Sequence, residues 1–170
     1  MNSELPDSAS QISEQKYQEF YAKAVAEQNL LLALVAALVS SLIGSFIWML
    51  ITVLLHMHIG YVALGIGLLV SYSVRYMGKG LTPIYGVIGA VATLVSCILG
   101  EFAATIVLIL ENENGSFLDF LNDVSFSMIL EASLMHTGPI TWFIYAIGIY
   151  EGYKFSKRTF SHEELQAAGV

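Results

Sequence analysis

The chain has 170 residues, of which 56% are hydrophobic and 12% charged, and its formal net charge is −7. So high an apolar fraction excludes an ordinary soluble domain, and the length fits one compact helical bundle. Seven basic residues against 14 acidic ones leave no basic surface, which excludes nucleic acid as a partner. The composition predicts an all-α integral membrane protein whose first partner is the lipid bilayer.

The N-terminal region, residues 1–29, is predicted to be a polar tail that leads into a helix. Residues 1–11 are polar and acidic with an early proline, and we expect them to be disordered. From Ile12 to Gln28, charged residues alternate with an aromatic stripe at helical spacing. This stripe leaves two alternatives, an interfacial helix that runs into the first span or a solvated helical extension without membrane contact.

Four spans are predicted in the domain formed by residues 30–158, the first two at 30–55 and 59–75. The first contains no charged residue, and its small residues four apart form a seam for another helix. The second is short and rich in small residues, Gly67 among them, so we expect it to be central and closely packed.

The third predicted span, residues 83–108, begins at Pro83 with Thr82 as its cap. From Thr82 to Leu110, 29 residues include one ionisable residue, Glu101. At ~1.5 Å per residue they reach roughly 43 Å, more than the ~30 Å hydrocarbon core. Small residues including Gly89 and Gly100 recur at helical spacing, which predicts close packing of helices. The single cysteine, Cys97, is predicted to be one more small packing residue.

An amphipathic outer-face segment is predicted between the third and fourth spans. Residues 117–130 place their apolar residues on one helical face, which we expect to cover Phe102 to Leu110; an irregular loop is the alternative. The fourth span, residues 139–155, starts at a proline and carries aromatic residues near its ends, as interfacial belts do. Residues 159–170 form a short cytoplasmic tail.

The basic residues predict the orientation of the chain. Lys16 and Lys23 precede the first span, Arg75 and Lys79 lie between the second and third, and the remaining three follow the fourth. Four spans with both termini in the cytoplasm place all seven inside, as the positive-inside rule requires.

Glu101 is the main candidate for chemistry, because an ionisable residue in a membrane helix is a functional hypothesis by default. At roughly 28 Å from the inner boundary, it lies near the outer edge of the hydrocarbon. There it is predicted to join His136 with His56 or His58 in a polar outer-face cluster, able to hold a proton or a divalent cation such as zinc. A structural carboxylate and a relay between protomers are the alternatives. The spacing is not a metal signature, so no metal or cofactor is assigned.

Three further predictions concern packing and catalysis. Gly67, Gly89 and Gly100 are predicted to be helix-packing residues. Arg75 and Glu151 lie at the same inner depth and are predicted to form an interfacial ion pair. Because no nucleophile is accompanied by a base and an orienting acid, we expect the protein not to be an enzyme.

The runs Gly60 to Ala63, Val74 to Gly80 and Ile149 to Ser156, with Gly86 to Gly89 and Gly100, resemble a family of small bacterial four-helix membrane proteins that has no assigned activity. The resemblance covers about residues 57 to 158. It implies a bacterial inner membrane and the four-span fold, and it brings no catalytic or binding residues.

Two functions follow as hypotheses. The first is a non-catalytic accessory or scaffold subunit that packs against itself or a larger membrane complex, because small-residue seams recur on several spans. The second is a homo-oligomeric transporter or channel for a small solute or ion, with Glu101 near its outer mouth.

Overall fold

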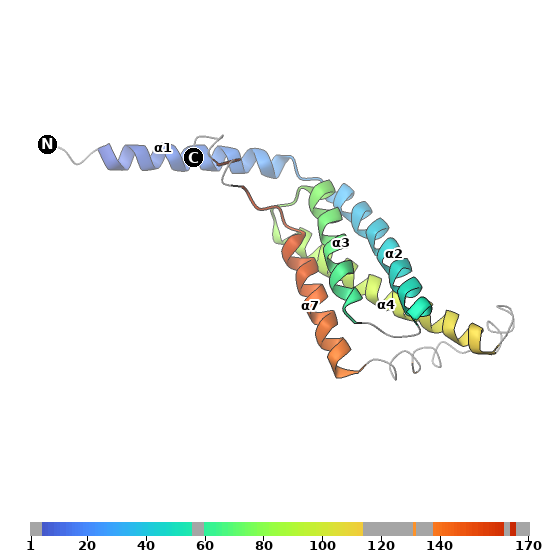
Figure 1. Ribbon diagram of the computed structural model, residues 1–170. Coiled ribbons are helices and arrows are strands. Elements are labelled where there is room, and N and C mark those ends of the chain that lie inside the picture. The colour runs from blue at the N-terminus through green and yellow to red at the C-terminus, as the bar shows by residue number, and fades with distance from the viewer. Residues whose placement is uncertain (1–4, 56–59, 114–130, 132–137, 162–163, 166–170) are drawn as a thin grey trace.

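The computed structural model describes residues 5–55, 60–113, 131, 138–161 and 164–165. These residues form five helices and no strand: α1 (Leu5–Ala26), α2 (Leu30–Leu55), α3 (Val62–Gly78), α4 (Pro83–Glu113) and α7 (Pro139–Phe155) (Figure 1). The prediction of an all-α fold is confirmed over this part of the chain.

Four of the helices, α2, α3, α4 and α7, lie side by side as a bundle. α2 packs against α3 and α4, and α7 packs against the same two helices on their other side. α2 and α4 run in one direction, and α3 and α7 run in the opposite direction (Figure 1). α1 extends sideways from the end of the bundle where α2 begins, and residues 156–161, which follow α7, lie at the same end (Figure 1).

Within the part of the chain that the structure describes, two helices are long and apolar enough to cross a membrane by length and composition, namely Leu30–Leu55 and Pro83–Glu111. α3 and α7 are shorter, with 17 residues each. At 1.5 Å per residue, each of the short helices is roughly 26 Å long.

The helix starts have local causes. Asn29 precedes α2, and its Oδ1 accepts a hydrogen bond from the backbone N–H of Leu32 at 3.0 Å, which caps the helix. Pro139 stands in the first turn of α7, where its missing N–H costs nothing. The predicted cap Thr82 instead directs its hydroxyl to Oε1 of Gln28, at 3.4 Å.

The N-terminal helix is longer than the sequence predicted. Residues 5–11 belong to α1, so the expected disorder of that segment is wrong for these residues. Pro6 falls in the first turn, where proline is compatible with a helix, and this allows α1 to begin at Leu5. Near the other end of α1, Phe20 packs against Phe160 with ring centroids 4.9 Å apart.

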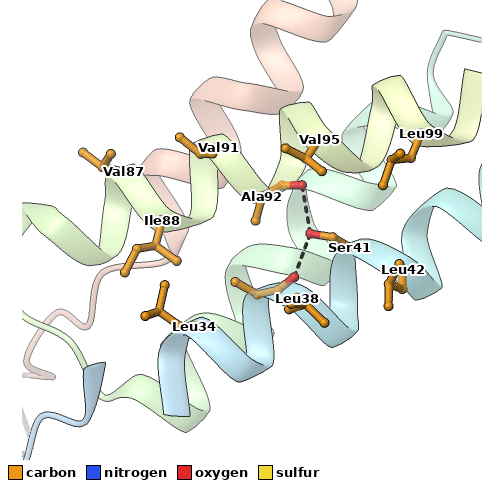
Figure 2. A pocket seen from close by; sticks show the side chains of 11 residues that line it. Leu34, Leu38, Ser41, Leu42, Val87, Ile88, Val91, Ala92, Val95 and Leu99 are labelled. Atoms are coloured by element: carbon orange, nitrogen blue, oxygen red, sulfur yellow. Dashed lines mark hydrogen bonds between the residues drawn. The ribbon is translucent and has the colours of Figure 1, made fainter. Parts of the chain in front are cut away.

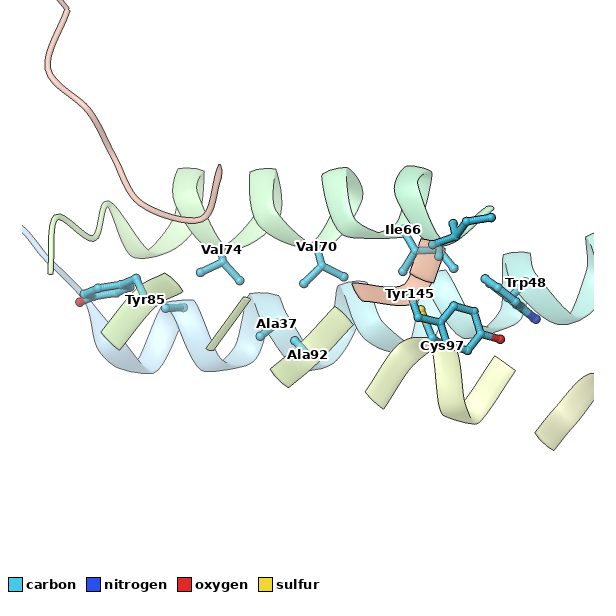
Figure 3. Packing of buried hydrophobic residues seen from close by; sticks show 12 residues of the cluster. Ala37, Trp48, Ile66, Val70, Val74, Tyr85, Ala92, Cys97 and Tyr145 are labelled. Carbon is cyan, nitrogen blue, oxygen red and sulfur yellow. The ribbon is translucent and has the colours of Figure 1, made fainter. Parts of the chain in front are cut away.

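Small residues and a few large side chains fill the core. Alanines from α2, α3 and α4 lie beside Val70 and Val74, and Trp48, Cys97 and Tyr145 gather at one end of the cluster (Figure 3). The small residues let the helices approach one another closely. The predicted cover by residues 117–130 lies outside the described residues.

Candidate functional site

Glu101 lies inside the bundle, with 7% of its surface exposed. One of its carboxylate oxygens, Oε2, accepts a hydrogen bond from Nε1 of Trp48 at 3.1 Å. Trp48 belongs to α2 and is 1% exposed, so the bond joins α2 to α4 away from water. Each residue lies 18 positions beyond the first residue of its helix. Since α2 and α4 run in the same direction, this equal spacing brings the two side chains to the same depth.

Tyr145 of α7 completes the surroundings of this carboxylate. Its ring meets the ring of Trp48 edge to face, with centroids 5.5 Å apart, and Trp142 packs on it at 5.9 Å. Its hydroxyl is buried and lies within range of an electrostatic interaction with Glu101, as does the thiol of Cys97. Figure 3 shows Trp48, Tyr145 and Cys97 close together.

This arrangement is a polar contact point among three helices. A carboxylate inside a membrane protein is costly unless it is hydrogen-bonded, and here an indole N–H supplies one donor. The site can hold α2, α4 and α7 in register, and its carboxylate is a group able to hold a proton.

Of the four residues in the predicted outer-face cluster, the structure describes only Glu101. His56, His58 and His136 lie outside the described residues, so their position relative to Glu101 stays a prediction. Among the residues that the structure describes, no group of three or more His, Cys, Asp or Glu side chains is close enough to hold a metal ion.

The glycines predicted to pack helices lie at three different helix contacts. A Cβ atom built on Gly67 of α3 would lie 2.6 Å from the backbone oxygen of Gly148 in α7. On Gly100 of α4 it would lie 2.6 Å from Cβ of Trp48, and on Gly89 it would overlap the side chain of Ser156. No side chain fits at these contacts without separating the helices.

The predicted pair of Arg75 and Glu151 is not brought together. Arg75 donates a long hydrogen bond, 3.4 Å, from Nη2 to the hydroxyl of Thr159. Oε2 of Glu151 is buried and has no hydrogen-bond partner in the described structure. Arg75 is drawn instead toward the segment after α7, where it lies in electrostatic range of Glu164.

Trp48 and Tyr145 were missed as partners of Glu101. A signal for Trp48 was present, because an indole N–H in an otherwise apolar helix requires an acceptor at the same depth. Tyr145 had no comparable signal, since its aromatic neighbours made it look like part of an interfacial belt.

Comparison of the chain with protein-family models, with curated proteins and with solved structures gives no match. The site therefore has to be interpreted from its own geometry, and the resemblance to small bacterial four-helix membrane proteins remains a prediction.

Proposed function

We propose that the chain is a four-span protein of the bacterial inner membrane that acts as a non-catalytic subunit and pairs with a second copy of itself. α2 and α4 span the bilayer fully, and α3 and α7, packed between or beside them, cross most of its ~30 Å core. Support for the orientation comes from the basic residues, all of which lie on α1 or at the bundle end next to it.

One observation carries the proposal, an apolar groove between α2 and α4 on the surface of the bundle. Its volume is about 710 Å³. The hydroxyl of Ser41, at its floor, lies 2.7 Å from the backbone oxygen of Ala37 and 2.9 Å from that of Ala92 (Figure 2). The one polar group of the floor is thus directed into the protein, and the groove offers only apolar surface. Its rims are aliphatic side chains: Leu34, Leu38 and Leu42 on α2, and Val87, Val91, Val95 and Leu99 on α4.

A second copy of the chain is the occupant that fits this groove. In a membrane, helices associate by close packing, because lipid is as apolar as leucine and gives no hydrophobic driving force. The occupant must therefore be a helix that is apolar over the whole length of the groove. α2 has 26 residues without a charge and forms one rim of the groove, so two copies can pair face to face.

Cysteine cross-linking in native membranes tests this pairing. Leu38 on the groove and Tyr150 on α7 are similarly exposed, at 63% and 59%, and are each replaced by cysteine. Leu38→Cys is expected to give a covalent dimer on oxidation, whereas Tyr150→Cys is not. The wild type is the background, because Cys97 is buried. Equal cross-linking of both variants, or of neither, contradicts the pairing, and a cross-link to a different protein would favour a larger complex.

The second candidate is a transporter or channel, and the burial of Glu101 favours it. Its weakness is the packing of the bundle, since α3 meets α7 backbone to backbone at Gly67 and Gly148 and leaves no room for a path there. Flux into proteoliposomes, comparing the wild type with Glu101→Gln, tests it. A flux that depends on Glu101 supports transport, and equal, negligible flux in both removes it.

A further inference from the structure

A second cavity lies at the end of the bundle that carries the basic residues, and its volume is about 740 Å³. Three cationic side chains line it, Arg75 and Lys79 from the end of α3 and Arg158 from the segment after α7. The side chains of Thr159 and Ser161 line the same cavity. Cationic groups together with hydroxyl donors form the set that binds phosphate groups.

Backbone hydrogen bonds fix the position of this cavity. The backbone oxygen of Gly78 accepts a bond from the N–H of Asn29 at 3.0 Å, and that of Gly80 accepts one from the N–H of Arg158 at 2.7 Å. Lys79 lies between these two glycines. Three separate segments of the chain are thereby joined around Lys79, so the cavity is built by the fold.

The backbone of Lys79 is in the left-handed region, with φ 49° and ψ 29°. It is the only residue other than glycine with positive φ in the described part of the chain. Glycine takes this conformation at the end of a helix without steric cost, and it flanks Lys79 on both sides. A lysine held in a strained position points to a use for its side chain.

The charges in the cavity are only partly balanced. Arg158 is paired with Glu164, with 2.7 Å between Nη2 and Oε1. Glu27 also lines the cavity. Within the described residues, neither Arg75 nor Lys79 forms an ion pair, and Arg75 has only its long bond to Thr159. Glu164 also lines the cavity and lies in electrostatic range of Arg75, but it is paired with Arg158, so Arg75 and Lys79 can each still bind an anion.

Two aromatic side chains, Tyr72 and Tyr76, also line the cavity. Tyr72 and Tyr76 stack with ring centroids 6.2 Å apart, and both are exposed. Tyrosine at this level of a membrane protein lies among lipid headgroups. We propose that the cavity binds the phosphate of an anionic phospholipid of the cytoplasmic leaflet, with Arg75 and Lys79 on the phosphate and the two tyrosines beside the glycerol. The proposal rests on the membrane topology proposed above.

Native mass spectrometry of the full chain in neutral detergent tests the site. Phosphatidylglycerol and phosphatidylcholine are added in equal amounts to the wild type, Arg75→Gln, Lys79→Gly and the control Lys16→Gln, whose charge lies on α1. Lys79→Gly removes the charge while relieving the backbone, so its thermal stability should equal or exceed that of the wild type. The wild type and Lys16→Gln should retain phosphatidylglycerol preferentially. Each cavity variant should lose about fivefold in that retention, the contribution of one basic residue near an anionic surface.

Inorganic phosphate distinguishes a lipid site from a general anion site. At the same concentration as the lipid, it should leave the bound phosphatidylglycerol in place. Displacement by inorganic phosphate, equal retention of the two lipids, or an equal loss in Lys16→Gln would each overturn the proposal. The same spectra report the oligomeric state, so a monomer that retains phosphatidylglycerol contradicts the pairing of two copies and still supports the cavity.

Discussion

Glu101 ties three helices together at a single side chain, because its carboxylate is bonded to Trp48 of α2 and lies beside Tyr145 of α7. The donor is the indole N–H of Trp48, and an indole can only donate a hydrogen bond. Without the carboxylate of Glu101, this buried N–H would have no hydrogen-bond partner. Loss of this contact should therefore be felt in the stability of the whole bundle.

Trp48→Phe tests the contact, because it removes the N–H and retains an aromatic ring. We expect it to lower the stability by about 1–3 kcal/mol, the range for a buried group that loses its partner. The measurement is thermal unfolding in detergent, with Trp142→Phe, an exposed tryptophan, as the control. The loss should shrink when Glu101 is already methionine, which has a similar size and no oxygen acceptor, and this separates the hydrogen bond from the change in ring size. An unchanged loss in that background would assign the effect to packing alone.

Two glycines of α3 provide a matched test of helix packing. A Cβ atom on Gly67 would meet the backbone of Gly148 in α7, whereas one on Gly65 would meet no atom within 4 Å. Gly67→Ala should therefore cost about 1–3 kcal/mol by forcing α3 and α7 apart, and Gly65→Ala should be neutral. Thermal unfolding of the two variants checks this difference, and equal effects would refute the backbone contact.

The carboxylate and the glycines can also be ranked against each other. Leucine at Gly67 or Gly100 should reduce expression and thermal stability more than Glu101→Gln does, because leucine separates the helices while glutamine keeps a hydrogen-bonding side chain. The opposite ranking would make Glu101 the central residue of the fold.

At the scale of elements, the turn after α7 is stabilised by charge. Oε2 of Glu164 accepts a hydrogen bond from the N–H of Ser161 at 3.1 Å, and Oε1 is bonded to Arg158. These hydrogen bonds lower the pKa of Glu164 below its ordinary value of 4.5, and the bond from the backbone of Ser161 contributes most to this lowering. A lowered pKa in the folded chain means that this stabilisation is present above the unfolded pKa and is lost as the pH falls through the folded one.

The pH dependence of this turn is measurable by carboxyl NMR. The titration midpoint of Glu164 should lie below pH 4.5 in the wild type. Arg158→Gln should move the midpoint upward, because it removes one of the bonds, and Lys154→Gln should leave it in place. A midpoint that does not respond to Arg158→Gln would mean that the ion pair is absent in solution.

A helix was predicted well from the sequence where one clear feature, such as a long apolar run, marked both of its ends. α2 was bounded correctly at residues 30 and 55 because an uninterrupted apolar run has no alternative to a helix. Residues 5–11 were misjudged, since their polar composition resembles disorder while their start at Leu5 and Pro6 is compatible with a helix. The composition of a short polar segment shows that it can be exposed to solvent. It does not show whether the segment is disordered or continues a neighbouring helix.

The candidate site was predicted less completely. Glu101 stood out because it is ionisable in an apolar run, but its partners come from other helices and depend on how these align. The cavity around Lys79 was hidden for the same reason, since Arg158 reaches it from 79 positions further along the chain. Contacts between residues so far apart in the chain depend on how the helices pack, and this packing cannot be inferred from a single sequence.

At the scale of the whole molecule, charge separates the two ends of the bundle. All seven basic residues lie on α1, in or just after the last turn of α3, or in or just after the last turn of α7, and these parts share one end of the structure (Figure 1). The proposed topology, with both termini inside, accounts for this distribution, because basic loops are retained in the cytoplasm.

Reporter fusions test this topology most directly. A reporter that is active only in the cytoplasm, and one that is active only in the periplasm, are each fused after Val170 and inserted within residues 111–116. The account predicts a cytoplasmic signal after Val170 and a periplasmic signal within 111–116. A periplasmic signal from the C-terminus would contradict the four-span topology, and with it the assignment of the basic end to the cytoplasmic surface.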